Sequence, residues 1–140
     1  LQQMNKRILV ATHDPEPSWQ QDSNLFVLDY APHTWLFPRM AAVIHHGGAG
    51  TTAAGLHAGV PSLIMPFSND QPMWAKRVCE LSTGTSFRPD HKPSEPKLHH
   101  AITQLFDTTI VHKAQEIGKR MQAEQGVDNA VAWLRAQSLV

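Results

Sequence analysis

Residues 45–52 read HHGGAGTT, and this stretch decides the fold. The apolar run over residues 41–44 before it predicts a buried strand. Residues 51–58 after it predict a helix that ends at Gly59, with Pro61 just beyond. A strand, a glycine-rich turn and a helix therefore follow one another directly. Glycines let a ligand approach the backbone, and the free amides of the first helical turn carry the positive end of the helix dipole, so this turn suits a bound phosphate.

A second polar loop follows about twenty residues later, where residues 66–72 read PFSNDQP. A strand is predicted over residues 60–65 before it and a helix over about 70–81 after it, because Asp70 is a favoured N-cap residue and Pro is tolerated in a first turn. Both loops leave strands at the carboxyl end, where parallel sheets bind ligands, so we expect them to face one crevice. Asp70 and Gln71 present a carboxylate and an amide suited to sugar hydroxyls, and a plain capping role for Asp70 is an equally open interpretation.

The rest of the chain alternates short apolar runs with helix-forming segments. This order predicts an α/β fold with a Rossmann-like parallel sheet and helices on both faces. Further strands are expected at residues 7–12, 25–28 and 85–87, a long loop at 13–24, and a short helical piece at 34–37. Helices are expected at residues 97–106, 110–124 and 128–136, with Gly126 separating the last two.

Composition limits the classes of function. The 140 residues are 41% apolar, which is enough for one domain over residues 1–140. Twelve basic and twelve acidic side chains balance, which argues against binding to nucleic acid or an anionic membrane surface. Cys79 is the single cysteine, which excludes an internal disulfide framework and favours a reducing, cytoplasmic setting. No signal-like segment or apolar span occurs, and the start at Leu1, just before a strand, suggests a piece of a longer polypeptide.

The histidine pair before the glycines has two interpretations. His46 stands where the strand meets the turn and can donate a hydrogen bond to a phosphate oxygen, although a packing role at the strand end is the alternative. His45 points to the opposite side in a strand, so we expect it to be structural. That geometry, with no other ligand at a usual spacing, disfavours a metal site. A hydroxyl of Thr51 or Thr52 can cap the helix or reach a phosphate.

These motifs, in this order, resemble the donor-binding signature of nucleotide-sugar-dependent glycosyltransferases of the GT-B fold, the UDP-glucuronosyl/glucosyltransferase-like family. Residues 30–33, 35–37, 45–52 and 70–71 are similar to sterol glucosyltransferases and to bacterial macrolide and antibiotic glycosyltransferases. The resemblance covers about residues 30–80, together with the helical ending. It implies the carboxy-terminal half of a GT-B fold that lacks its first strand and belongs to a longer two-domain enzyme.

The resemblance also implies roles for individual residues. The nucleotide and diphosphate would be bound by Tyr30, which stacks on the base, by Ala31 and His33, and by His46, Gly48, Gly50 and Thr51. Asp70 and Gln71 would contact hydroxyls of the donor sugar. Ala54 stands where plant members carry a ribose-binding Glu, so the resemblance leaves the choice between uridine and deoxythymidine donors open. The catalytic histidine and acceptor pocket are expected in an amino-terminal domain of the same polypeptide, and no metal or cofactor is expected beyond the donor, a UDP-sugar or dTDP-sugar.

The sequence therefore predicts the donor-binding domain of an inverting glycosyltransferase that transfers a hexose to a hydroxyl of a sterol, lipid or polyketide-like acceptor. Alone it should bind the donor without catalysis, and any peripheral membrane association would come from the amino-terminal half. The alternative is a non-catalytic nucleotide-sugar-binding subunit that acts with a separate acceptor-binding chain through an exposed apolar interface. A nucleotide-sugar epimerase is a third possibility, but it would need acid and base carboxylates that the sequence does not reveal.

Overall fold

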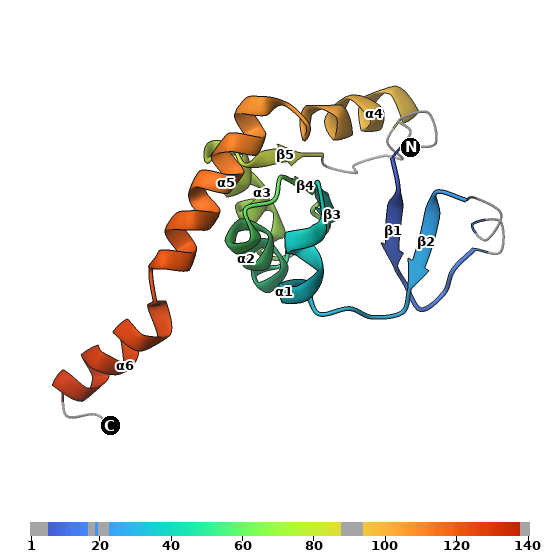
Figure 1. Ribbon diagram of the computed structural model, residues 1–140. Coiled ribbons are helices and arrows are strands. Elements are labelled where there is room, and N and C mark those ends of the chain that lie inside the picture. Colours follow the sequence, from blue (N-terminus) through green and yellow to red (C-terminus); the bar gives the residue numbers. More distant parts are fainter. Residues whose placement is uncertain (1–5, 17–18, 20–22, 88–93, 138–140) are drawn as a thin grey trace.

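The computed structural model describes residues 6–16, 19, 23–87 and 94–137 (Figure 1). Over these residues strands and helices alternate along most of the chain. The strands are β1 (Ile8–Ala11), β2 (Leu25–Leu28), β3 (Val43–His45), β4 (Ser62–Ile64) and β5 (Gly84–Ser86). The helices are α1 (His33–Leu36), followed by a 3₁₀ turn (Phe37–Arg39), then α2 (Ala49–Ala58), α3 (Gln71–Glu80), α4 (Glu95–Gln104), α5 (Thr108–Ala123) and α6 (Gly126–Ala136).

All strand pairs within the described residues are parallel, and they form two sheets. In the larger sheet β4 lies between β3 and β5, with Ile44 opposite Leu63 and Leu63 opposite Thr85. In the smaller sheet β1 pairs with β2, with Ile8 opposite Leu25. Figure 1 shows the β1–β2 pair set apart from the helix-covered body, on the side of β3. The predicted parallel α/β architecture is confirmed, with the strands divided between two sheets.

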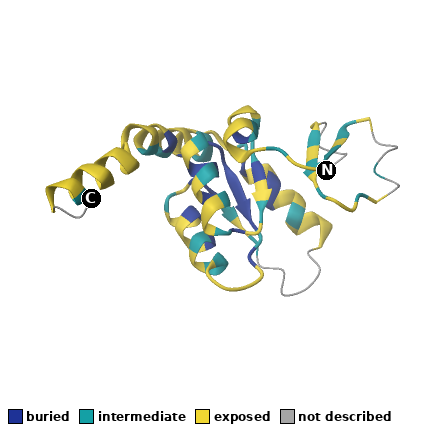
Figure 2. Cartoon of the chain, turned by 90° about the horizontal axis from the view of Figure 1, so that it is seen from below, coloured by how far each residue is buried: buried dark blue, intermediate teal, exposed yellow. Residues whose placement is uncertain are grey.

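Helices cover both faces of the larger sheet. Leu63 and Ile64 are adjacent in β4 and point to opposite faces, and both are fully buried. Leu63 packs with Ala101, Ile102 and Leu105 from α4 and the residue after it, whereas Ile64 packs with Ala75 and Val78 of α3. All three residues of this central strand are buried (Figure 2).

Helix α2 ends where the sequence predicts, at Gly59. Gly59 adopts the left-handed conformation with φ of 70°, and its amide bonds to carbonyls of the last helical turn. A Cβ on Gly118 of α5 would lie 2.6 Å from the Cα of Gly59, so the two glycines let α2 and α5 pack closely. This contact joins α5 to the domain.

The predicted boundaries differ from the structure in small ways. Helix α2 begins at Ala49, before the predicted residue 51, because Gly48 rather than a threonine takes the N-cap position. The break between α5 and α6 occurs at Gln125, which has φ of 48°, whereas Gly126 already belongs to α6. Parts of the predicted loop at 13–24, and Lys92 and Pro93 before α4, lie outside the described residues.

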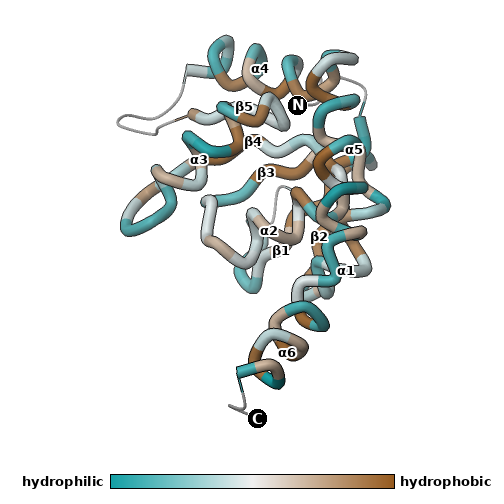
Figure 3. Tube along the Cα trace, turned by 90° about the vertical axis from the view of Figure 1, so that its left-hand side faces the viewer, coloured by the Kyte–Doolittle hydropathy of each residue, from teal (hydrophilic) through white to brown (hydrophobic). Residues whose placement is uncertain are grey.

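Two parts of the described chain bury little. Helix α6 extends away from the body and has no buried residue, and its apolar Val127, Val131 and Trp133 are exposed (Figures 1 and 2). Figure 3 shows apolar and polar positions mixed along this helix. Leu9 of β1 and Phe26 of β2 are exposed as well. None of the described helices is long and apolar enough to span a membrane.

Candidate nucleotide-sugar site

The glycine turn after β3 and the loop after β4 meet at the carboxyl edge of the larger sheet. A Cβ on Gly47 would lie 2.5 Å from Cγ2 of Ile64, 3.4 Å from the carbonyl oxygen of Gln71 and 3.7 Å from its Cβ. Gly47 also has φ of 91°, a conformation that side chains other than glycine rarely adopt. The predicted convergence of the two loops is therefore confirmed, and glycine at position 47 makes it possible.

The start of α2 offers backbone donors beside this contact. The first helical hydrogen bond runs from the amide of Thr52 to the carbonyl of Gly48, so the amides of Ala49, Gly50 and Thr51 have no acceptor within the helix. No side chain caps this end, and a Cβ at Gly50 would meet nothing within 4 Å. The open turn therefore presents donors and the positive end of a helix dipole, an arrangement that suits an anion.

His46 lies over the glycine turn. It is exposed, and a Cβ on Gly48 would lie 2.7 Å from its Nε2. An imidazole placed there is free to meet a ligand on the turn. The two threonines differ in access, because Thr51 is half-buried whereas Thr52 is 1% exposed with no partner for its Oγ1. Neither threonine caps the helix, and only Thr51 is accessible from the turn.

His45 is the last residue of β3, and its ring contacts the glycine turn. Its Nδ1 accepts a hydrogen bond from the amide of Gly47 at 3.1 Å, and its Nε2 is buried without a hydrogen-bond partner. Burial, reinforced by the charges of His46 and His33, lowers the pKa of His45 from 6.5 to about 4. The ring is therefore neutral near pH 7, with its proton on Nε2 and its Nδ1 available to Gly47.

The Asp70–Gln71 pair is held by different contacts from those expected. Asp70 occupies the N-cap position of α3, but its side chain makes no capping bond and its Oδ2 accepts from the indole Nε1 of Trp74 at 2.8 Å. Gln71 Oε1 accepts from the amides of Phe67 at 2.8 Å and Ser68 at 3.1 Å. The capping interpretation of Asp70 is wrong for its side chain, which stays exposed at the crevice.

The three residues that are predicted to contact the nucleoside follow β2 in the chain. Tyr30 is 79% exposed, Ala31 is half-buried, and His33 begins α1. The His33 ring stacks on Phe37 with 4.5 Å between ring centroids. The charge of His33 contributes to the lowered pKa of His45, so this segment lies near the glycine turn.

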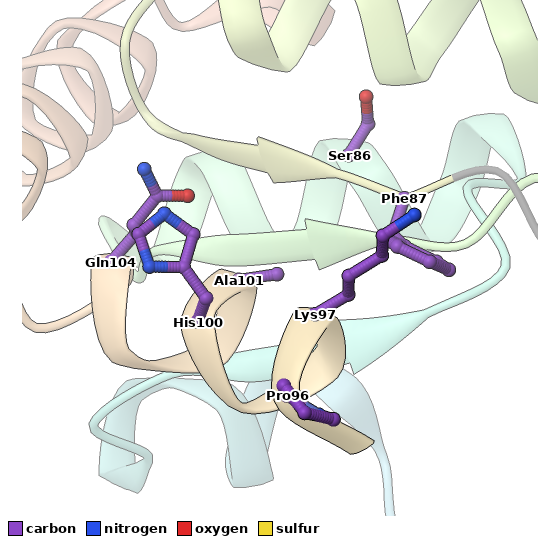
Figure 4. A pocket seen from close by; sticks show the side chains of 7 residues that line it. All are labelled: Ser86, Phe87, Pro96, Lys97, His100, Ala101 and Gln104. Atoms are coloured by element: carbon purple, nitrogen blue, oxygen red, sulfur yellow. The ribbon is translucent and has the colours of Figure 1, made fainter. Parts of the chain in front are cut away.

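A separate hollow lies between β5 and α4, and none of the predicted site residues line it. Its volume is about 420 Å³, and Ser86, Phe87, Lys97, His100 and Gln104 are among the residues around it (Figure 4). Among the described residues, no three His, Cys, Asp or Glu side chains gather in a way that could hold a metal ion.

Sequence reasoning missed two supporting contacts. The four-residue spacing of Asp70 and Trp74 places them on one helical face and was a usable signal for their hydrogen bond. The contact between His45 and Gly47 gave no such signal, because it depends on the unusual backbone of the turn.

Comparisons with known proteins extend these observations. The chain is 48% identical over 107 residues to a sterol 3-beta-glucosyltransferase of Arabidopsis thaliana, an alignment that covers 76% of this chain and 17% of that protein. The glycotransferase of kitacinnamycin superposes with a TM-score of 0.74 at 23% identity, over 82% of this chain and 30% of that one. The glycosyltransferase VinC, solved in complex with DTDP, gives a TM-score of 0.65 at 27% identity, over 79% of this chain and 29% of that one.

These similarities agree on the fold and on its place in the larger proteins. The fold is that of the carboxy-terminal part of GT-B glycosyltransferases. The chain spans less than a fifth of the length of the sterol glucosyltransferases that it matches in Arabidopsis thaliana and Cryptococcus neoformans. Because residues 3–134 match the family described as erythromycin biosynthesis protein CIII-like, C-terminal domain, the chain belongs to this family of glycosyltransferase domains.

Proposed function

We propose that this chain binds the nucleotide-sugar donor of a glycosyltransferase that transfers a hexose to an acceptor hydroxyl. The observation that carries the proposal is the contact of Gly47 with Gln71, which places a turn rich in free amides beside the exposed carboxylate of Asp70 and the half-buried amide of Gln71. A nucleoside diphosphate sugar has its diphosphate next to its sugar, as these two loops require. The glycosyltransferase relatives and the DTDP complex of VinC support the same ligand class.

Different residues would bind different parts of the donor. The amides of Ala49, Gly50 and Thr51, together with His46, would hold the diphosphate. Asp70 and Gln71 would bind sugar hydroxyls, and Tyr30 would stack on the base with Ala31 and His33 beside the nucleoside. These roles agree with the exposure of Tyr30, His46 and Asp70.

In this proposal the reaction inverts the anomeric carbon. The acceptor oxygen bonds to that carbon while its bond to the diphosphate breaks, and the acceptor proton passes to a base in an amino-terminal domain of the same polypeptide. The positive end of α2 and the donors around it stabilise the charge that builds on the leaving diphosphate. The acceptor, a sterol, lipid or polyketide-like alcohol, binds that second domain.

Two features support a larger protein around this chain. Within the described residues, β1 pairs only with β2 and β3 only with β4, so each sheet ends in an open edge. The strands of a doubly wound sheet lie side by side in the order 3-2-1-4-5-6, numbered along the chain. If β1 and β2 are the second and third strands of such a sheet, they fill its first two places, and β3, β4 and β5 fill the last three. A preceding strand at position 1 would join the two sheets, and the exposed apolar residues of α6 offer a surface to a further domain.

Isothermal titration of the chain with UDP, dTDP and ADP tests the proposal. We expect UDP or dTDP to bind at least tenfold more tightly than ADP, and the tighter ligand identifies the base. Substitution of Asp70 by Ala should then remove the additional affinity of the corresponding nucleotide sugar without changing that of the diphosphate. Equal binding of all three nucleotides, or no binding at millimolar concentration, would contradict the proposal for this chain.

A further inference from the structure

Trp74 makes a contact that bears directly on the Asp70–Gln71 pair. Its side chain is half-buried on α3, and its indole Nε1 donates to Oδ2 of Asp70 at 2.8 Å. Residues four apart share a helical face, and helical side chains lean toward the amino-terminal end. The indole of Trp74 therefore reaches back over the first turn of α3 to the carboxylate.

The Asp70 carboxylate has no role in closing the helix. Asp70 has φ of −79° and ψ of −9°, and its backbone carbonyl accepts from the amides of Met73 and Trp74. An N-cap side chain normally bonds to the second or third amide of the helix from an extended backbone, and the Asp70 side chain makes no such bond. The indole therefore orients this carboxylate through Oδ2, while the Asp70 residue as a whole stays exposed.

Gln71 is oriented in a complementary way. Its Oε1 accepts two backbone amides of the preceding loop, from Phe67 and Ser68, so its amide nitrogen is the group left for a ligand. Position 70 then offers an acceptor and position 71 a donor. A sugar hydroxyl is both donor and acceptor, so it can satisfy the two together.

We propose that Trp74 is a positioning residue for the donor sugar, which it serves by fixing the Asp70 carboxylate beside the amide of Gln71. The inference rests on the proposed function, and it concerns only the sugar portion of the ligand. The amides that would meet the diphosphate belong to α2, whereas the indole and the backbone amide of Trp74 both donate to Asp70. Loss of the indole donor should therefore weaken the binding of the nucleotide sugar without weakening that of the nucleoside diphosphate.

The test compares Trp74→Phe with the matched variant Trp133→Phe. Phenylalanine keeps an aromatic ring at position 74 and removes only the N–H donor, whereas Trp133 is an exposed tryptophan on α6. Affinities for UDP and UDP-glucose, and for dTDP and dTDP-glucose, are measured by titration calorimetry. Trp74→Phe should weaken binding of the sugar nucleotide by about fivefold to tenfold, the effect of losing about one neutral hydrogen bond to the sugar, and change binding of the diphosphate by less than about twofold. Trp133→Phe should change neither.

A second measurement needs no ligand. Hydrogen exchange of the indole N–H, followed by NMR, should be slower for Trp74 than for Trp133, and in Asp70→Ala it should become faster for Trp74 while that of Trp133 is unchanged. In the Asp70→Ala background, Trp74→Phe should have no further effect on affinity for the nucleotide sugar. Equal exchange of the two indoles, an unchanged affinity for the nucleotide sugar, or an equal loss for diphosphate and nucleotide sugar would each overturn the role of Trp74. A wild-type chain that binds the diphosphate and its sugar conjugate equally would instead remove the sugar site itself, and the inference with it.

Discussion

The backbone amide of Gly47 donates a hydrogen bond to Nδ1 of His45 at 3.1 Å, across a turn in which Gly47 has φ of 91°. The bond requires an unprotonated Nδ1, and burial keeps the ring neutral by lowering the pKa of His45 to about 4. The shape of the glycine turn thus depends on the protonation state of His45. His45 has a structural role, as the sequence predicts, and what it supports is the turn of the candidate phosphate site.

Stability should therefore fall in acid because of His45. Its pKa is about 4 in the fold and 6.5 in the unfolded chain, so the unfolded chain binds more protons between these values. The contribution of neutral His45 is complete above pH 6.5, declines as the pH falls and is gone below about 4. Lowering the pKa of His45 from 6.5 to about 4 corresponds to roughly 3 kcal/mol as an upper value.

Urea unfolding at pH 7 and at pH 4.5 measures this dependence. His45→Asn supplies the control, because its Oδ1 can accept from the Gly47 amide without titrating in this range. The variant should lose less stability than the wild type between the two pH values. An equal loss in both proteins would show that His45 does not carry the acid sensitivity.

His46 should matter for binding and not for folding. Its ring is exposed over the glycine turn, so His46→Ala removes little packing. A hydrogen bond from imidazole to a charged phosphate contributes about 1.5–3 kcal/mol, which predicts a loss of about tenfold to a hundredfold in affinity for UDP or dTDP. Titration calorimetry measures the affinity and thermal unfolding the stability.

The exposed His112 of α5 provides a matched control for His46. His112→Ala should change neither affinity nor melting temperature. If His46→Ala binds the diphosphate as tightly as His112→Ala does, the assignment of His46 to the phosphate is wrong.

The sequence was sufficient for the order of elements and for the meeting of the two loops, because both depend on local patterns. Apolar runs located the strands, and Gly59 located the end of α2 through a conformation that glycine favours. Side-chain partners were less accessible. Asp70 fits the N-cap preference, yet the indole of Trp74 competes for the same carboxylate, and only the three-dimensional arrangement decides between them.

The division into two sheets was not predictable from the pattern of strands alone. Apolar runs such as β1 and β2 indicate strands, but the neighbour of each strand depends on contacts across the sheet. Ile44 illustrates the point, since a strand pattern predicts burial and the structure leaves this side chain 46% exposed at the edge of the sheet.

Leu63 and Ile44 are opposite each other on β4 and β3, and they should differ in their contribution to stability. Leu63 is fully buried against α4, so Leu63→Ala should cost about 2–5 kcal/mol in the free energy of unfolding. Ile44→Ala should cost about 1 kcal/mol or less, because much of that side chain already meets solvent. Urea unfolding of both variants gives the comparison, and an equal large cost would mean that the open edge of β3 is covered in solution.

Gly47 and Gly50 should respond in opposite ways to substitution by alanine. At position 47 the new Cβ would lie 2.5 Å from Cγ2 of Ile64 in a backbone with φ of 91°, so Gly47→Ala should destabilise the fold by about 2 kcal/mol or more. At position 50 the Cβ meets nothing within 4 Å and the residue is helical, so Gly50→Ala should keep or raise stability, by at most about 1 kcal/mol.

The same pair separates folding from binding. The Cβ at position 50 would project from the open first turn of α2, where the diphosphate is proposed to approach the backbone. Gly50→Ala should therefore weaken UDP or dTDP by about tenfold while its melting temperature is unchanged or higher. Calorimetric titration and thermal unfolding on the same preparation give both quantities. Unchanged affinity in a fully folded Gly50→Ala protein would place the diphosphate away from this turn, because a close approach of phosphate to the Gly50 backbone leaves no room for a methyl group.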